Sequence, residues 1–211
     1  MRERDQLIER VARLIERILP VDWRVAITGP AAVFSRYGKE FARSQATIVS
    51  ASSVIVFALV GIYLRSIPWA VLAMIPNAIA LLLLFGAMGH WGIKMDFGSA
   101  IVAPIAIGIA ADDTIHFLTA YARERRSGQE PVGALRRAIV GVGEAVIATA
   151  LALSLGFLSM MTSPFSSIVN IGLLSAIAII GATLADLLVL PALIATVAEW
   201  RGFQRIPGRH E

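Results

Sequence analysis

The sequence predicts an all-α polytopic membrane domain of five transmembrane helices, preceded by a short α+β segment. Three observations support this prediction. First, 57% of the 211 residues are hydrophobic and the mean hydropathy is +0.73, whereas soluble domains are about 45–50% apolar. Second, the apolar residues gather in long blocks. Third, the arginines stand at the edges of these blocks, as topology signals do. They do not form a phosphate-binding face, so the net charge of +4 does not predict a nucleic acid partner.

The first 43 residues predict the α+β segment. Apolar residues recur at helical spacing over 5–19, and Pro20 stops that helix. Residues 23–28 alternate in polarity as a short strand does, and a weaker helix is expected over 31–43. We interpret residues 1–43 as the tail of a small domain that begins further upstream.

Five apolar blocks follow, and each reaches the ~20 residues that cross a ~30 Å hydrocarbon core. They cover residues 45–64, 68–89, 98–121, 140–162 and 167–197. The last block is too long for one straight span, so we place its membrane part at 167–190 and expect the part after Pro191 along the interface. Residues 44–198 then form one transmembrane domain, and 199–211 form a tail.

Positive charge is concentrated in three regions that five alternating spans place on one side of the membrane. These regions hold Arg65, then Arg123, Arg125, Arg126, Arg136 and Arg137, and finally Arg201, Arg205 and Arg209. The positive-inside rule predicts that this side is cytoplasmic, which gives a multi-pass protein of the cell (inner) membrane with a cytoplasmic C-terminus and an extracytoplasmic N-terminal segment. The basic loop 122–139 is interpreted as a solvated connector, with binding of anionic lipid headgroups as the alternative.

No export signal opens the sequence, because residues 1–20 are rich in Arg and Glu and lack an apolar core. An upstream membrane helix is therefore expected. The chain is expected to be the C-terminal part of a larger protein or one subunit of a split one.

Three ionisable residues in the third apolar block are the candidate functional site: Asp112, Asp113 and His116. Charge at membrane depth is expensive and is a functional-site hypothesis by default. In a helix His116 lies three or four residues from either carboxylate, so either can face the imidazole. Burial and a neighbouring cation shift a carboxyl pKa in opposite directions, and such a site can load and release a proton near neutral pH. The alternative is packing by interhelical hydrogen bonds, worth about 0.6 kcal/mol each.

Other polar residues within the spans are supporting candidates. Asn77 and Thr149 are potential relay members, although each alone is more typical of a local packing hydrogen bond. Asp186 lies in the inner half of the last block, and two roles stay open for it: a proton exit or a structural bond to the loop arginines. Gly108 is one of several small residues that let helices approach closely.

Several site types are not expected. Asp112 and His116 have ligand-compatible spacing, but His90 and His210 are badly placed to complete a site, so no metal is expected. The absence of cysteine excludes disulfides and thiolate ligands. No phosphate-binding loop and no nucleophile–base pair is evident, so we expect neither a cofactor nor an enzyme.

The motif Gly108-Ile-Ala-Ala-Asp112-Asp113-Thr-Ile-His116 resembles the tenth transmembrane helix of the resistance–nodulation–division (RND) superfamily. Within this superfamily it is most similar to the MMPL or hydrophobe/amphiphile exporter branch. That branch is related to sterol-sensing-domain proteins. Other motifs agree in order over about residues 25–198: Arg65-Ser66, Pro76-Asn77, Met88-Gly-His-Trp-Gly-Ile93, Gly156-Phe157, Ser163-Pro-Phe165 and Ala185-Asp-Leu-Leu-Val-Leu-Pro191. Taken together these motifs are specific.

The resemblance implies a transporter of twelve transmembrane helices in two halves, each with a large extracytoplasmic porter domain. Residues 1–43 then resemble the tail of the second porter domain, and the five spans resemble helices eight to twelve. The resemblance also implies proton-driven movement of hydrophobic or lipid-like substrates, with Asp112 and Asp113 as the relay. Gly108 would be the close-packing position beside them and His116 a modulator.

The expected partners are membrane lipids, a hydrophobic or lipid-like substrate, and the N-terminal half in the same polypeptide or as a split subunit. Other copies of the chain in an oligomer are a further candidate partner, and the sequence does not give the oligomeric state. The partner helix four lies in the other half, so a lone half is not expected to transport. The alternative function is a sterol- or lipid-sensing regulatory membrane module without transport, and a component of protein export is a third reading.

Overall fold

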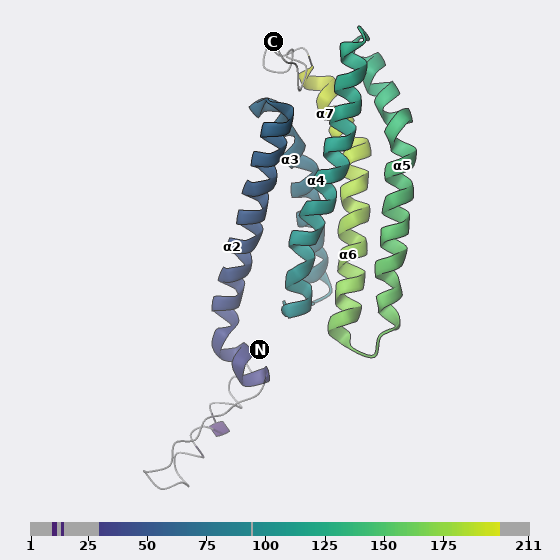
Figure 1. Cartoon of the computed structure of the whole chain (residues 1–211). Helices are drawn as coiled ribbons and strands as arrows, with labels where there is room; N and C mark the ends of the chain where they lie inside the picture. Colours follow the sequence, from purple (N-terminus) through teal and green to yellow (C-terminus); the bar gives the residue numbers. More distant parts are fainter. Residues whose placement is uncertain (1–9, 12–13, 15–29, 94, 199–211) are drawn as a thin grey trace. The chain divides into compact units, whose positions relative to one another are not determined.

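The structure is a computed structural model that describes residues 10–11, 14, 30–93 and 95–198 (Figure 1). The predicted helix over 5–19 lies mostly outside the described residues, and the predicted strand over 23–28 lies entirely outside them. The chain divides into two compact units, Met1–Thr47 and Ile48–Glu211. The candidate site belongs to the second unit, which is described by itself below.

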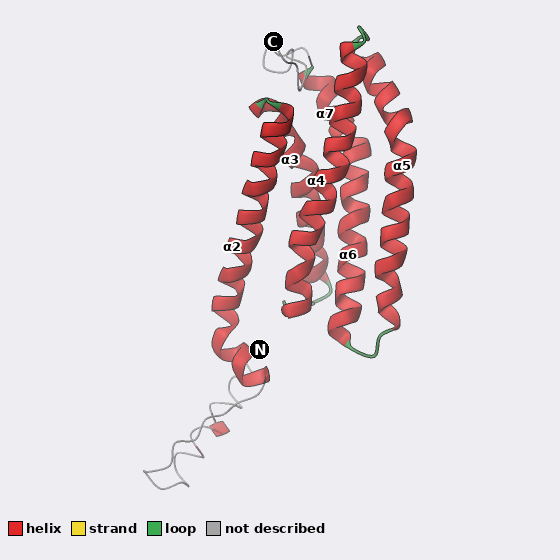
Figure 2. Ribbon diagram, in the orientation of Figure 1, coloured by secondary structure: helices red, strands yellow, loops and turns green. Residues whose placement is uncertain are grey.

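Within the described residues, five helices are long and apolar enough to cross a membrane, which confirms the predicted all-α fold. The described part of the chain contains helices and loops and no strand (Figure 2). The helices are α2 (Pro30–Leu64), α3 (Ile67–His90), α4 (Phe97–Arg126), α5 (Pro131–Ser159) with the short η1 (Met160–Thr162), and α6 (Ser166–Leu184), which continues through the π-helix η2 (Ala185–Val189) into α7 (Leu190–Val197).

Two helices extend further than the apolar blocks predict. α4 runs to Arg126, beyond the predicted end at residue 121, and α5 begins at Pro131 instead of 140. Long charged side chains can reach water from a helix end, and proline fits the first turn of a helix. The charged connector therefore shortens to residues 127–130. The helix predicted over 31–43 and the first span form one continuous helix, α2.

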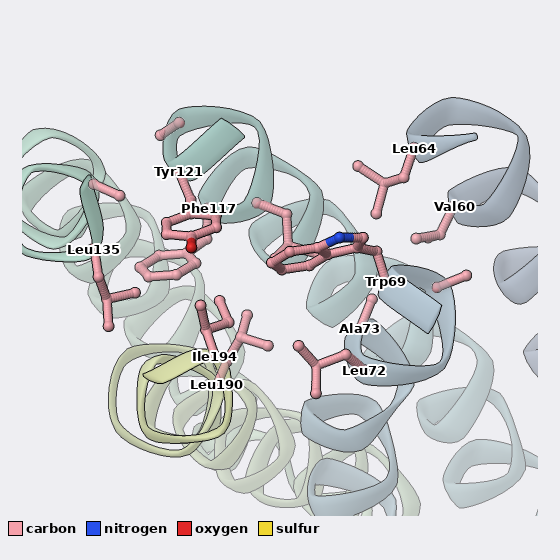
Figure 3. Packing of buried hydrophobic residues seen from close by; sticks show 14 of the residues in the cluster. Val60, Leu64, Trp69, Leu72, Ala73, Phe117, Tyr121, Leu135, Leu190 and Ile194 are labelled. Carbon is pink, nitrogen blue, oxygen red and sulfur yellow. The ribbon is translucent and has the colours of Figure 1, made fainter. Parts of the chain in front are cut away.

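We call the end of the second unit that holds the α2–α3 and α4–α5 loops the arginine end. A cluster of large side chains packs there, built on Trp69 of α3, Phe117 and Tyr121 of α4, and Leu190 and Ile194 of the last helix (Figure 3). The rings of Trp69 and Tyr121 lie 5.6 Å apart between centroids. The two ring planes are tilted by 42°. Aromatic pairs at this distance add to packing, so this cluster holds α3, α4 and α7 together.

Small residues hold the middle of the unit. Ala80, Ala110 and Ala182 pack on one another from α3, α4 and α6. Between helices in a membrane, small side chains allow close approach and van der Waals packing. We call this the alanine layer. It separates the arginine-end cluster from a second apolar cluster that contains Leu84 and Leu174.

The opposite end is fixed by a polar clasp at the start of α4. Asp96 caps the helix: its Oδ1 accepts from Ser99 N at 2.7 Å, and Ser99 Oγ accepts from Asp96 N at 2.8 Å. Ser167, at the start of α6, donates to Asp96 Oδ2 at 2.5 Å. Partial burial raises the pKa of Asp96, but the hydrogen bonds from Ser167 and Ser99 outweigh it and hold the pKa below the ordinary value of 3.8. The clasp therefore joins the starts of α4 and α6.

Candidate functional site

The candidate residues of α4 lie at the middle of its membrane-crossing segment. Asp112 is the central residue of the segment Gly98–Arg126. At 1.5 Å per residue, about 21 Å of helix separates it from either end. An ionisable side chain at this depth is costly and functionally informative.

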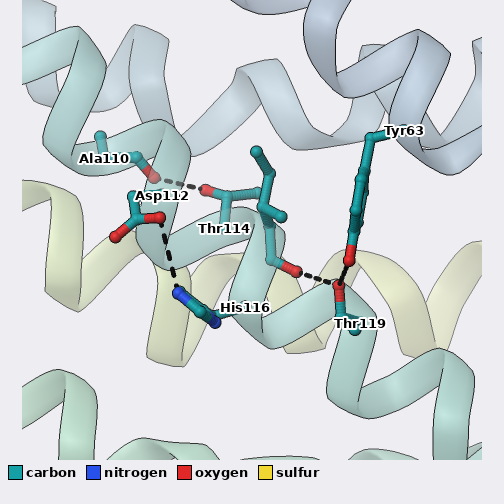
Figure 4. A network of polar contacts seen from close by, with 7 residues as sticks. Tyr63, Ala110, Asp112, Thr114, His116 and Thr119 are labelled. Carbon is teal, nitrogen blue, oxygen red and sulfur yellow. Dashed lines mark hydrogen bonds and ion pairs between the residues drawn. The ribbon is translucent and has the colours of Figure 1, made fainter.

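Asp112 and His116 form a pair on the outer face of α4. His116 Nε2 lies 3.5 Å from Asp112 Oδ1, and their side chains are 67% and 72% exposed (Figure 4). The pair is an ion pair when the imidazole is protonated. Because the two residues are one helical turn apart, the local spacing alone brings them together, as the sequence predicts.

The pair belongs to an exposed stripe along α4. Its members recur every three or four residues and are Ile101, Ile105, Gly108, Asp112, His116, Thr119 and Arg123. A charge on a lipid-facing surface at the centre of a membrane helix costs about 2.5–3.5 kcal/mol. Polar protein or water covers this stripe more favourably than hydrocarbon does.

Gly108 is the open point of the stripe. A Cβ added there would meet nothing within 4 Å. Gly108 was expected to be a close-packing position, and among the described residues nothing packs against it. Any close neighbour of Gly108 therefore comes from outside the described residues.

Asp113 lies between this stripe and the interior of the unit. It is partly buried, and its direction differs from that of Asp112 by about 100°, the rotation of one residue in a helix. Asp113 is thus placed on the border between the two faces of α4.

A second polar site lies on the inner face of α4. Asp186, from the π-helix η2, is 1% exposed, and Thr114 is completely buried. Thr114 Oγ1 lies 2.6 Å from Asp186 Oδ1 and 2.9 Å from the carbonyl oxygen of Ala110 (the latter contact in Figure 4). Within the described residues, Asp186 has a hydrogen-bond partner in Thr114. Both roles left open for Asp186, a proton exit and a structural bond to the loop arginines, stay predictions.

The π-helix that carries Asp186 has a cause in the sequence. Leu190 N bonds the carbonyl of Ala185, five residues earlier, as a π-helix requires. Pro191 follows and has no N–H to donate to Leu187, its partner in a regular α-helix. π-Helical turns inside α-helices occur frequently at functional sites. The last block, which is too long for one straight span, thus continues past Pro191 through a widened turn in one helix.

The two remaining supporting candidates differ in position. Asn77 of α3 is 2% exposed, and its Nδ2 donates to the carbonyl of Ala73 at 3.1 Å. Its Oδ1 has no partner among the described residues. Thr149 of α5 is exposed, and its hydroxyl lies 3.0 Å from the carbonyls of Ala145 and Val146 in its own helix. Asn77 is therefore an interior residue, whereas Thr149 makes local bonds.

Sequence reasoning missed Thr114. Its neighbour Asp113 was a candidate, but a threonine in a membrane helix usually bonds its own backbone, as Thr114 does with Ala110. One feature of the sequence could have indicated Thr114: it lies in the same motif as two intramembrane aspartates.

An open groove of about 630 Å³ lies on the outer side of α5, against η2. Its lining is apolar, with Ile147, Leu151 and Leu188 among its residues, except for Glu144. Within the described part of the chain, no three His, Asp or Glu side chains gather as a metal site would require.

Comparisons with known proteins give a family match and a relative. The model of the MMPL family matches residues 1–210. A protein of Methanocaldococcus jannaschii that is named as a membrane protein is 29% identical over 194 residues, which make up 92% of this chain and 49% of that protein. The chain thus spans about half the length of this curated relative.

Proposed function

Since this chain belongs to the MMPL family of membrane proteins, we propose that it is the C-terminal part of a transporter in which proton movement drives the transfer of hydrophobic or lipid-like substrates. The observation that carries the proposal is the position of Asp112, Asp113 and His116 at the middle of α4. Carboxyl groups at this depth bind and release protons only when water or another protein group reaches them, which is what coupling requires.

The exposed stripe of α4 supports a role for a second protein surface. Asp112 and His116 are mostly exposed, and Gly108 has open space beside it. We infer that this stripe packs against a helix of the N-terminal half, in the same polypeptide or in a split subunit. The twofold greater length of the M. jannaschii protein is consistent with this inference.

The arrangement of charge supports an orientation. Five of the six described loop-region arginines, Arg123, Arg125, Arg126, Arg136 and Arg137, flank the α4–α5 connection at the arginine end. By the positive-inside rule we propose that this end faces the cytoplasm and that the protein resides in the cell (inner) membrane. Asp96 and Ser167 then lie on the extracytoplasmic side.

The test uses the complete protein in liposomes with an imposed pH gradient. A fluorescent phospholipid reports substrate transfer, and an entrapped pH-sensitive dye reports proton flux. We expect Asp112→Asn and Asp113→Asn to lower both rates by about 100-fold or more, the lower range for a lost proton-transfer group. Thr149→Val is the matched control, because Thr149 bonds only its own helix in the described structure. Wild-type rates in both aspartate variants would defeat the proposal.

A lipid-sensing module without transport is the second candidate, and the groove between α5 and η2 favours it. This groove is apolar apart from Glu144, which suits an acyl chain with a polar group nearby. The test measures how much lipid the protein retains. Retention that is lost in Leu151→Trp, but unchanged by the pH gradient and by both aspartate variants, would support lipid sensing over transport.

A further inference from the structure

We propose that Asn77, Thr114 and Asp186 form a second, internal proton site on the opposite face of α4 from the Asp112–His116 pair. In this site Asp186 holds the proton, and the Thr114 hydroxyl passes the change in protonation to α4. The role of this site in transport rests on the proposed proton coupling. Whether Asp186 holds a proton is tested separately. Three properties of these residues support the site: their placement, the number of protons available to them, and their burial.

The alanine layer brings the three residues to one level. α3 runs in the opposite direction to α4 and α6 (Figure 1). Asn77 precedes Ala80 by three residues, Thr114 follows Ala110 by four, and Asp186 follows Ala182 by four. Because Ala80, Ala110 and Ala182 pack on one another, each polar residue lies one turn further toward the arginine end. Three helices thus place one polar side chain each in the same interior layer.

The site and the exposed pair occupy different faces of one helix. Thr114 is two residues from both Asp112 and His116, so its side chain is rotated by about 200° from theirs. Thr114 is completely buried, whereas the pair is mostly exposed. α4 therefore carries one polar site toward its exposed side and one toward α6.

Counting protons assigns a protonated state to Asp186. Thr114 Oγ1 has two close oxygens, the carbonyl of Ala110 at 2.9 Å and Asp186 Oδ1 at 2.6 Å. A threonine hydroxyl has only one proton to donate. If Asp186 is protonated, it donates to Thr114, and Thr114 donates to Ala110. If Asp186 is ionised, Thr114 must turn to Asp186 and give up Ala110. Only the protonated form satisfies both short contacts.

The other polar atoms of Asp186 and Asn77 are consistent with a site that takes up a proton. Asp186 Oδ2 and Asn77 Oδ1 are buried acceptors with no hydrogen-bond donor among the described residues. Such buried, unsatisfied atoms are few in native proteins, and each calls for an explanation such as a proton, a water or a catalytic role. An ionised Asp186 in this layer would be a buried charge with a single hydrogen bond, which is unfavourable.

Asp113 lies between the two sites along α4. It is partly buried and is the immediate neighbour of both Asp112 and Thr114 in the sequence. The other ionisable side chains of α4 are Asp112 and His116 on its exposed face and, toward the arginine end, Tyr121, Arg123, Glu124, Arg125 and Arg126. α5 has Arg136, Arg137 and Glu144, α3 has His90 at its far end, and α6 and α7 have none. Asp113 is therefore the ionisable residue that lies closest in sequence to Thr114.

The experiment is infrared difference spectroscopy of the 211-residue chain in lipid nanodiscs across a pH titration, with the carbonyl stretch of protonated aspartic acid as the signal. We expect Asp186→Asn to remove one buried carboxyl band. Thr114→Val should shift that band because the carboxyl loses its acceptor, and Thr114→Ser should restore it. Thr149→Val, which removes an exposed hydroxyl with local bonds, should leave the band unchanged.

Three results would overturn the inference. They are a wild-type band that persists in Asp186→Asn, a Thr114→Val spectrum equal to that of Thr149→Val, and loss of the band when sodium replaces potassium at constant pH. The last result would assign the site to a sodium ion. Transport that ignores a pH gradient would defeat the proposed function but leave these bands as expected. Proton-driven transport without the bands would defeat this inference alone.

Discussion

Asp112 and Asp186 are the same residue type in opposite environments, although both lie inside membrane-spanning helices. The Asp112 side chain is 72% exposed and faces His116, whereas Asp186 is 1% exposed and faces Thr114. In the proposed function, the exposed carboxyl exchanges protons with the partner or water that covers it, and the buried one exchanges through the Thr114 hydroxyl. The same residue type would then have two different proton routes because its two environments differ.

The polar clasp at Asp96 makes a residue-scale prediction about pH. Because the folded-state pKa of Asp96 is below 3.8, its contribution to stability is complete above the unfolded value and is lost as pH falls through the lower folded value. Asp96→Ala should lower the free energy of unfolding by about 1 kcal/mol at pH 7, as loss of a helix cap does. Thermal unfolding in detergent at pH 7, 5 and 3 measures this difference.

The same measurement has an internal control. Asp96→Asn keeps a capping side chain and should lose less than Asp96→Ala at pH 7. The advantage of wild type over either variant should be equal at pH 7 and pH 5 and smaller at pH 3. An advantage that grows as the pH falls would contradict the assignment of a lowered pKa.

Local spacing explains which site residues can be predicted from sequence. Asp112 and His116 meet because they are four residues apart in a helix, and a helix was predictable there. Thr114 and Asp186 are 72 positions apart. Their contact depends on which faces of α4 and η2 point inward. A membrane helix is apolar on all sides, so its sequence gives little indication of that direction.

Among the elements, the five membrane helices follow directly from hydropathy and length, whereas the π-helix does not. Apolar blocks of at least ~20 residues are sufficient to predict crossing helices. The widened turn at Ala185–Val189 depends on how the helix accommodates Pro191 against its neighbours. A proline predicts that one hydrogen bond is lost, but packing determines whether the helix bends, ends or widens.

The contact of α5 with α6 makes a prediction at the scale of elements. A Cβ added to Gly172 would collide with the backbone carbonyl of Phe157, which cannot move aside as a side chain can. Gly172→Ala should therefore push the two helices apart and lower the free energy of unfolding by about 1–3 kcal/mol. Unfolding of the purified chain in denaturant, followed by circular dichroism, gives this value.

Gly156→Ala is the matched control for Gly172→Ala. Gly156 is also inside α5, but an added Cβ would meet nothing within 4 Å. Alanine in a helix interior is favoured over glycine by about 0.5–1 kcal/mol, so this variant should be as stable as wild type or more stable. Equal destabilisation by both substitutions would show that the close contact has no energetic weight.

At the scale of the whole molecule, the chain is one part of a larger arrangement in the proposed function. It spans about half the length of its M. jannaschii relative, and the stripe carries the exposed Asp112–His116 pair at its middle. The sequence predicts that the partner helix is elsewhere, on the basis of the family resemblance. The sequence does not indicate that the stripe points away from α6, whereas the structure shows this direction.

Gly108 provides the whole-molecule prediction. Gly108→Leu should leave the 211-residue chain as stable as wild type, because open space surrounds the position. It should strongly reduce co-purification with a separately expressed N-terminal half, because the side chain fills the proposed contact. Gly141→Leu, on α5 with equally open space, should leave co-purification unchanged.

Two results would revise this picture. If Gly108→Leu and Gly141→Leu reduce co-purification equally, the stripe is not the contact surface. If Gly108→Leu instead abolishes self-association of the chain, seen by sedimentation in detergent, the partner on the stripe is a second copy.

The central position of α6 has a consequence for biosynthesis. α6 packs against α3, α4 and α5, yet it is the last of the five spanning helices to leave the ribosome, because synthesis proceeds from the N-terminus. Thr114 and Ala110 of α4 are therefore inserted before the helix that carries Ala182 and Asp186 has been synthesised. The bundle therefore acquires its central helix last, and the inner polar site exists only after translation has passed Asp186.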